Sequence, residues 1–327
     1  MRASLARAFA VPAFLLLTAA CGAEPALETP AAQATAAPVV AGKKINTGPD
    51  QNRVRAERVD AIAAQVPKDI AADGKLTVGF SGQGAAPLVF RADDDTTLIG
   101  VETDIAQLVA DVLGLEISPE ISSWENLFLA AKSGKDEVVF NNVTVTEERK
   151  DTYDFATYRV DQLGWQVPDN SPVKAIAKAA DIAGLRVSVG SGTNQEKILL
   201  DWDKQNKAAG LKPVEILYYE KYSDVLLGLK SGRVQAYFGP NPSIAYNIAV
   251  SGGSSIVGTF SGAGPDLQGL IAAMTKKDNG LVKPLSEALN TVIKNGKYKE
   301  VLDRWGLANE AIPESQINPP GLPRQES

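Results

Sequence analysis

The chain has 327 residues, 44% of them hydrophobic and 22% charged, and a formal net charge of −6 at pH 7. This length allows a large core and predicts two domains, while the acidic balance argues against a nucleic-acid partner, whose phosphate backbone requires a basic face. The absence of histidine and the single cysteine exclude Ser-His-Asp triads, HExxH metal sites, imidazole catalysis and internal disulfides. No catalytic residue, metal or cofactor is predicted.

Residues 1–20 have the pattern of a secretory signal. Arg2 and Arg7 precede an apolar run over residues 8–17, which is too short to span a bilayer as a mature helix. The small residues before Cys21 resemble a bacterial lipobox, in which the cysteine is lipidated and becomes the mature N-terminus, although Thr18 stands where leucine is usual. An ordinary signal peptide with an incidental cysteine is the alternative.

A disordered tether is predicted to follow the signal. Residues 22–48 are rich in Ala, Pro, Glu and Thr and contain almost no large apolar side chain, so they cannot bury enough surface to fold. A helix over residues 54–66 is expected to lead into the folded region, because this stretch has helical periodicity and good helix formers.

The chain then alternates strands with amphipathic helices. Residues 103–113 illustrate the pattern, since their apolar side chains recur at helical spacing and Gly114 follows as a C-cap. The predicted strands are 75–80, a strand beginning at 115–117, 138–140, 184–189, 214–218, 256–260 and 270–274, and the predicted helices are 103–113, 124–131, 195–202, 281–294 and 298–305. Residues beyond Ala311 are rich in proline and polar side chains and are expected to fray.

An internal repeat predicts two lobes of similar construction. Residues 124–140 align without a gap with residues 222–238, and both segments read as a helix, a Ser-Gly turn next to a basic residue, and a short apolar strand. A generic helix-turn-strand unit is the alternative explanation. Open parallel sheets bind ligands at the carboxyl ends of their strands, so we expect the loops after these strands to face a common cleft.

The stretch from Asn142 to Arg149 follows the buried strand 138–140 and is the best candidate for a binding site. It places a permanent cation beside hydroxyl and amide donors, among them Thr144. A guanidinium holds a carboxylate with two parallel hydrogen bonds, so this stretch predicts a seat for a small carboxylate. The alternative is a surface arginine that pairs with Glu147 or Asp151.

Several segments in this order resemble the family 3 extracellular solute-binding proteins, which are the polar-amino-acid receptors of bacterial ABC importers. The resemblance covers residues 76–307, most of the mature chain. The segments that carry it are Leu98–Asp104, Trp124–Gly134, Thr144–Arg149 followed by Tyr153–Phe155, Gly192–Glu196, and Gly296–Gly306.

The resemblance implies an α/β fold of the two-lobed type II periplasmic-binding-protein class, in which two crossover strands form a hinge and the first lobe is discontinuous. It divides the chain into a lipoprotein signal peptide (1–20), a tether with the leading helix (21–72), lobe one (73–160 and 259–312), lobe two (161–258) and a C-terminal tail (313–327).

The resemblance also implies a set of ligand-binding residues. Arg149 corresponds to the arginine that binds the ligand carboxylate, and Asn142 and Thr144 complete that seat, with ordinary turn chemistry as their alternative. Thr193 and Asn194 correspond to residues that reach the same carboxylate when the lobes close, since a helix start suits an anion; a capping turn is the alternative. Trp124 matches an aromatic that stacks on the ligand, or else belongs to the core.

Two positions depart from the family pattern. The acid that holds the ligand ammonium in α-amino-acid receptors falls at Pro240, which has neither charge nor N–H, and the first-lobe pocket aromatic is Ala85. Asn241 could accept a hydrogen bond from an ammonium without neutralising it. We therefore expect either a carboxylate ligand that is not a standard polar amino acid, or an amino acid whose ammonium is held elsewhere.

The predicted function is that of a monomeric receptor that binds an amino acid or related small carboxylate and passes it to the permease of an ABC importer. Its predicted location is the outer face of the cytoplasmic membrane, held there only by the lipid on Cys21. The alternative is an exported dehydratase-like enzyme on the same fold, which needs a poised acid in the cleft. The candidates for this acid are Glu125, Glu147 and Glu196.

Overall fold

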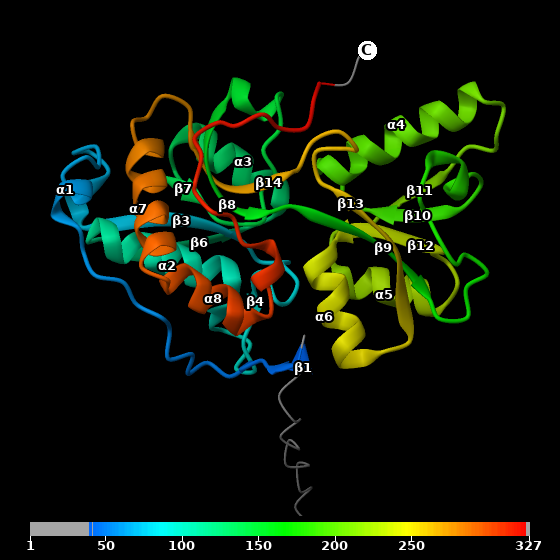
Figure 1. Cartoon of the computed structure of the whole chain (residues 1–327), viewed down its shortest axis with the longest axis horizontal. Coiled ribbons are helices and arrows are strands. Elements are labelled where there is room, and N and C mark those ends of the chain that lie inside the picture. Colours follow the sequence, from blue (N-terminus) through cyan, green and yellow to red (C-terminus); the bar gives the residue numbers. More distant parts are fainter. Residues whose placement is uncertain (1–38, 41, 325–327) are drawn as a thin grey trace, which may run out of the picture. The chain divides into compact units, whose positions relative to one another are not determined.

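Two five-stranded sheets organise the part of the chain that the computed structural model describes, residues 39–40 and 42–324 (Figure 1). The first sheet has the order β6-β3-β7-β14-β8, and the second has the order β11-β10-β12-β9-β13. The strands of the first are β3 (Lys75–Ser81), β6 (Glu116–Ser122), β7 (Val138–Val139), β8 (Tyr153–Val160) and β14 (Leu270–Lys276). Those of the second are β9 (Gln162–Pro168), β10 (Arg186–Val189), β11 (Glu215–Tyr218), β12 (Ala236–Pro240) and β13 (Ser254–Ser261).

The two sheets share one topology. In the first, β3 lies parallel to β6 and β7, while β14 runs antiparallel to β7 and β8. In the second, β10 lies parallel to β11 and β12, while β9 runs antiparallel to β12 and β13. Each sheet with its helices forms one lobe of an α/β fold, as the repeat predicted. The chain crosses between the sheets twice, from β8 to β9 through Asp161 and from β13 to β14.

Helices cover the sheets because successive strand residues point to opposite faces. On one face of the first sheet, Val138 and Phe140 pack in a cluster with the apolar sides of α2, α7 and α8. On the other face, Val139 packs with Leu127 of α3. The helices of this lobe are α2 (Val101–Leu113), α3 (Trp124–Ser133), α7 (Val282–Lys294) and α8 (Lys297–Trp305), and those of the second lobe are α4 (Asn194–Ala208), α5 (Tyr222–Lys230) and α6 (Asn241–Ser251).

The remaining elements are short. They are the hairpins β1 (Val39–Val40) with β2 (Lys43–Lys44) and β4 (Phe90–Arg91) with β5 (Leu98–Ile99), the helix α1 (Asp60–Ala63), and the 3-10 turns η1 (Ala71–Asp73), η2 (Arg149–Asp151), η3 (Ala179–Ile182) and η4 (Ala308–Glu310). Among the residues described, no helix combines the length and apolar character needed to cross a membrane. The signal segment and Cys21 lie outside the described residues.

The N-terminal approach to the first lobe differs from the prediction. Instead of a helix over residues 54–66, only α1 is helical, because the preceding backbone is held by tertiary contacts. Arg55 Nη2 lies 2.6 Å from Asp111 Oδ1, and Ala56 N–H donates to Asp111 Oδ2 at 2.9 Å. Ile45, within the expected tether, is 1% exposed and joins the first-lobe core. Tertiary bonds here outweigh a weak intrinsic helix propensity.

The C-terminal residues also differ from the prediction of fraying. Residues 312–324, the C-terminal strap, run along β8, which is the edge strand of the first sheet (Figure 1). Thr157 N–H donates to Gln316 O at 3.0 Å, and Asn318 N–H donates to Phe155 O at 3.0 Å. Leu322 pairs with Thr146 and is buried. The strap therefore satisfies backbone groups that an edge strand would otherwise leave unpaired; its proline-rich composition concealed this role.

Candidate ligand-binding site

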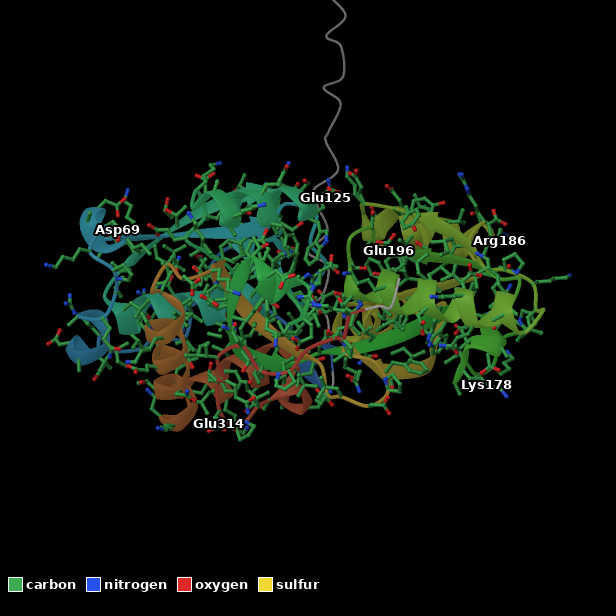
Figure 2. All side chains as sticks on the ribbon, turned by 90° about the horizontal axis from the view of Figure 1, so that it is seen from above. Asp69, Glu125, Lys178, Arg186, Glu196 and Glu314 are labelled. Atoms are coloured by element: carbon green, nitrogen blue, oxygen red, sulfur yellow. The ribbon has the colours of Figure 1, made fainter. Side chains whose placement is uncertain are left out.

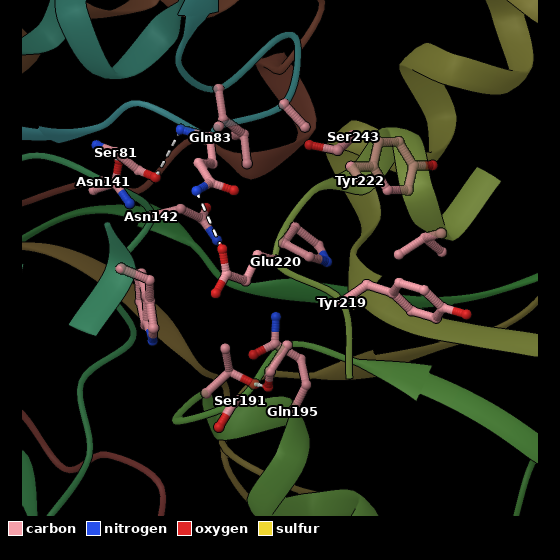
Figure 3. A pocket seen from close by; sticks show the side chains of 18 of the residues that line it. Ser81, Gln83, Asn141, Asn142, Ser191, Gln195, Tyr219, Glu220, Tyr222 and Ser243 are labelled. Carbon is pink, nitrogen blue, oxygen red and sulfur yellow. Dashed lines mark hydrogen bonds between the residues drawn. The ribbon is translucent and has the colours of Figure 1, made fainter. Parts of the chain in front are cut away.

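A cavity of about 400 Å³ lies between loops of the two lobes. Its walls are the loop after β3, the start of α3 and the turn after β7 from the first lobe, and the loops after β10, β11 and β12 from the second. Most of these loops follow the carboxyl ends of parallel strands, the place where open α/β sheets bind ligands. Figure 3 shows side chains of both lobes pointing into it.

The cavity lining has a distinct charge pattern. Among the described residues that line it, Glu125 and Glu220 are the carboxylates, and there is no lysine or arginine. Figure 2 shows Glu125 toward the junction of the lobes, whereas Lys178 and Arg186 lie toward the far end of the second lobe. The tyrosines at 218, 219, 222 and 237 and the indole of Trp124 add aromatic surface. Such a lining suits a ligand with apolar length and positive charge.

Three buried polar atoms of the lining have no hydrogen-bond partner among the described residues: Gln83 Oε1, Gln195 Oε1 and Ser243 Oγ. Gln195 is 7% exposed and Ser243 is 2% exposed. Buried polar groups in proteins are rarely left unpaired, because desolvation costs about 1–3 kcal/mol each. A polar ligand in the cavity would supply their partners.

Gln83 and Glu220 connect the two walls of the cavity. Gln83 Nε2, in the loop after β3, donates to Glu220 Oε2, in the loop after β11, at 3.4 Å (Figure 3). None of the sequence motifs contained Gln83, Glu220 or Ser243, and Gln195 lies within the Gly192–Glu196 segment but was assigned no role. The only available signal was position, because each lies just after a strand or in the first turn of a helix.

Arg149 lies beside the cavity but does not line it. Its Nη1 donates to Thr144 O at 2.9 Å, and its Nη2 donates to Gly192 O of the second lobe at 3.1 Å. The guanidinium carbon lies 4.9 Å from the ring centroid of Phe128 and 5.5 Å from that of Trp124.

The Arg149 charge has no direct counter-ion within the described part of the chain. The two acids predicted as alternative ion-pair partners of Arg149 bind other residues: Glu147 pairs with Lys150 at 2.8 Å and Asp151 with Arg324 at 2.6 Å. Burial lowers the pKa of Arg149 to about 10, although the nearby Asp161 carboxylate acts to raise it. The guanidinium therefore stays charged at neutral pH and could accept an anionic partner.

Thr144 and Asn194 use their side chains on a structural carboxylate. Thr144 Oγ1 donates to Asp161 Oδ2 at 2.7 Å, and Asn194 Nδ2 donates to the same oxygen at 3.1 Å and to Gly262 O at 2.9 Å. Asn194 also lines the cavity, whereas Thr144 does not. Burial raises the pKa of Asp161 despite these hydrogen bonds.

Asn142 lines the cavity with a left-handed backbone, φ 52°, and its Oδ1 accepts from Arg159 Nη2 at 2.6 Å. Arg159 is buried and also bonds Glu102 Oε1 at 2.6 Å and the Glu310 carboxylate. The Arg159 charge also acts on the nearby Asp161 carboxylate, and we call the two groups together the crossover cluster because Arg159 and Asp161 lie where β8 passes to β9. Its members are Glu102, Asn142, Thr144, Arg159, Asp161, Asn194 and Glu310.

Of the other predicted site residues, some line the cavity and some bond neighbouring residues of the fold. Trp124 lines the cavity and packs edge-on against Phe128, with ring centroids 5.0 Å apart. Thr193 also lines it, but its hydroxyl caps α4 by accepting from Glu196 N–H at 3.1 Å, so the capping geometry is present. Asn241 does not line the cavity; its Nδ2 donates to Gln162 Oε1 at 3.0 Å.

The two departures from the family pattern, Pro240 and Ala85, both line the cavity.

The candidate enzymatic acids give no support to catalysis. Burial acts to raise the pKa of Glu147, but its bonds with Lys150 and Gly321 N–H outweigh burial and lower it, away from the range of a general acid. Glu196 accepts from Gly192 N–H at 2.6 Å, as a helix-start acid does.

Comparisons with known proteins identify the family to which the chain is related. The model of the bacterial extracellular solute-binding proteins, family 3, matches residues 76–308. The arginine-binding protein ArgT of Corynebacterium glutamicum is 28% identical over 264 residues, which are 80% of this chain and 83% of that protein. The L-cystine-binding protein TcyJ of Escherichia coli is 29% identical over 237 residues, 71% of this chain and 82% of that protein.

Solved structures match the fold over the same region. An ancestral arginine-binding protein bound to arginine superposes with a TM-score of 0.60 at 28% identity, over 71% of this chain and 98% of the other. A mutant arginine-binding protein from T. maritima has a TM-score of 0.63 over 73% of this chain and 98% of the other, and at 23% identity it shows the fold alone. None of these comparisons supports an enzymatic alternative.

Proposed function

Because this chain belongs to the bacterial extracellular solute-binding proteins of family 3, we propose that it captures an amino acid outside the cytoplasmic membrane and delivers it, as a monomer, to the permease of an ABC importer. Cys21 would hold it at the membrane through an attached lipid. The arginine- and cystine-binding names of its relatives support an amino-acid ligand.

The observation that carries the proposal is the pairing of a two-walled cavity with an adjacent arginine that lacks a counter-ion. Arg149 Nη2 is held only by the Gly192 carbonyl, a neutral acceptor from the opposite lobe. A ligand carboxylate is a stronger partner, because a charge-assisted bidentate pair has about twice the strength of a neutral hydrogen bond. We therefore assign the carboxylate of the ligand to Arg149.

The remaining predicted residues take supporting roles in this proposal. The first N–H groups of α4, at Thr193 and Asn194, would face the same carboxylate as a helix N-terminus. The Trp124 indole would pack against the ligand. Asn142 and Thr144 would act chiefly by orienting the loop after β7, since their side chains bond Arg159 and Asp161. Asn241 would support β9 through Gln162.

Lobe closure would convert binding into a signal. The β8–β9 and β13–β14 connections join the lobes and would act as the hinge. A ligand that contacts both walls of the cavity stabilises the closed arrangement through its differential contacts, and the permease would read the closed surface.

The proposal is tested by titrating the purified protein with the twenty amino acids in a calorimeter and by mass spectrometry of small molecules released on unfolding. We expect at least one amino acid to bind with micromolar affinity, about −8 kcal/mol. Absence of any binding, together with no released amino acid, would contradict an amino-acid receptor.

A further inference from the structure

We propose that Glu220 binds the cationic nitrogen of the ligand, an ammonium or a guanidinium, and is the residue that selects a positively charged group in this cavity. The inference rests on the proposed amino-acid-binding function and names the partner of the ligand's positive charge. Pro240, at the end of β12, lines the same cavity and offers neither a charge nor an N–H.

The first argument comes from the charged side chains that line the cavity. A cation in the cavity would meet the carboxylates of Glu125 and Glu220 and no competing basic side chain among the described lining residues. Both glutamates are exposed, and Glu125 lies in the first turn of α3. Glu220 extends from the loop after β11 into the middle of the cavity, where Figure 3 shows it between Gln83 and Gln195.

The second argument comes from the hydrogen-bond and ion-pair partners of Glu220. Its hydrogen-bond partner among the described residues is the neutral Gln83 amide, at 3.4 Å, near the outer limit for a hydrogen bond. None of the ion pairs among the described residues includes Glu220. The Glu220 carboxylate is therefore accessible from the cavity and has no counter-ion among the described residues.

The third argument comes from hydrogen-bond acceptors in the cavity that have no partner among the described residues. Gln83 Oε1 and Gln195 Oε1 are buried without hydrogen-bond partners, and both residues line the cavity with Glu220. A group that donates several hydrogen bonds suits these two acceptors and the Glu220 carboxylate, and a hydroxyl, with its single O–H, could satisfy only one of them. An ammonium offers three donors and a guanidinium five, whereas a carboxylate would leave acceptors facing acceptors.

The position of Glu220 also links charge recognition to closure. Gln83 belongs to the first lobe and Glu220 to the second, 137 residues apart in the chain. A cation bound to both would be held by the two walls at once, so the charge would favour the arrangement in which the lobes approach. A neutral ligand would leave Glu220 with the weak Gln83 contact alone.

The test is calorimetric titration of the wild-type protein and the Glu220→Gln variant with L-arginine, L-citrulline and L-cystine. Glu220→Gln keeps the shape and removes the charge, and it should weaken binding roughly 10- to 100-fold, the effect of one charge-assisted hydrogen bond. Loss for arginine alone assigns the guanidinium to Glu220, and equal loss for every probe that binds assigns the α-ammonium.

The matched control is Glu215→Gln, an exposed glutamate on β11 that does not line the cavity; its affinities should stay within about twofold of wild type. The charge-reversing Glu220→Lys variant should abolish binding while melting at the wild-type temperature. Unchanged affinities in Glu220→Gln would overturn this inference and leave the amino-acid receptor standing. Failure of the wild-type protein to bind any amino acid would instead remove the proposed function itself.

Discussion

The crossover cluster and the cavity lie side by side and contain similar polar residues, yet they differ in how those residues are paired. In the cluster, Arg159 and Asp161 each bond several neighbours inside the protein, and Arg159 Nε and Glu310 Oε1 are the atoms left without a partner among the described residues. In the cavity, Gln83, Gln195 and Ser243 keep buried atoms without partners in the described chain, and Glu220 has only the long contact with the neutral Gln83 amide there. The first arrangement stabilises the fold, and the second is ready to receive a ligand.

The comparison shows that residue type at a motif position does not by itself identify a ligand contact. The family resemblance predicted Thr144 and Asn194 as ligand contacts, but the side chains of both donate to Asp161. Glu220 occupies no motif position and points into the cavity. What separates the two classes is whether the side chain has already found its partner within the chain.

The largest effect is expected from breaking the cluster at its central cation. Arg159 is 1% exposed and faces Glu102 and Glu310. Arg159→Leu leaves these carboxylates buried without compensation, which should lower the free energy of unfolding by about 3–5 kcal/mol. Urea unfolding measures this loss.

The control for this variant is Lys299→Leu, which removes a largely exposed pair with Asp303 at 2.7 Å and should cost less than about 0.5 kcal/mol. Equal losses in the two variants would mean that the cluster does not stabilise the fold as described.

The second-largest effect is expected on ligand affinity, and it distinguishes the role of Arg149 from that of the crossover cluster. Arg149→Gln should weaken ligand binding about 100-fold, because it removes the charged partner of the carboxylate. It should change the free energy of unfolding by less than about 1 kcal/mol, since the side chain bonds two neutral carbonyls. Calorimetry and urea unfolding of the same preparation measure both quantities. A variant that binds normally but unfolds easily would place Arg149 in the cluster.

The smallest effect is a pH dependence that belongs to the cluster. Burial raises the pKa of Glu310 from its ordinary value of 4.5 to about 7, against the opposing pull of Arg159. Between these values the folded state binds more protons than the unfolded state, so the stabilisation is complete below about pH 4.5 and is lost as pH rises through 7. The free energy of unfolding should fall by about 2–3 kcal/mol over that window.

Urea unfolding at several pH values between 4.5 and 8 measures this slope. Glu310→Gln should flatten it, with a remainder from Asp161, whose pKa burial also raises. Glu314→Gln, an exposed neighbour on the C-terminal strap, should keep the wild-type slope. A Glu310→Gln variant with the full slope would assign the proton uptake to another group.

Much of the fold followed from the sequence. The spacing of apolar residues located α2, the helices α7 and α8 were also predicted, and the repeat of residues 124–140 at 222–238 predicted two lobes of similar construction. Local pattern suffices for such elements because an amphipathic helix or a buried strand carries its own periodicity. It did not suffice for residues 54–59 or for the strap, whose conformations depend on Asp111 and on the edge of β8.

The sequence by itself determined the family and the lack of a charge at Pro240, and it singled out Trp124, which lines the cavity, and Arg149, which lies beside it. Only the tertiary structure decided which polar groups remain free for a ligand. Asn142 and Asn194 are bound by residues 17 and 33 positions away, and Gln83 meets Glu220 across 137 positions. Hydrogen-bond pairing at such separations is set by how the sheets and crossovers pack, and no local pattern encodes it.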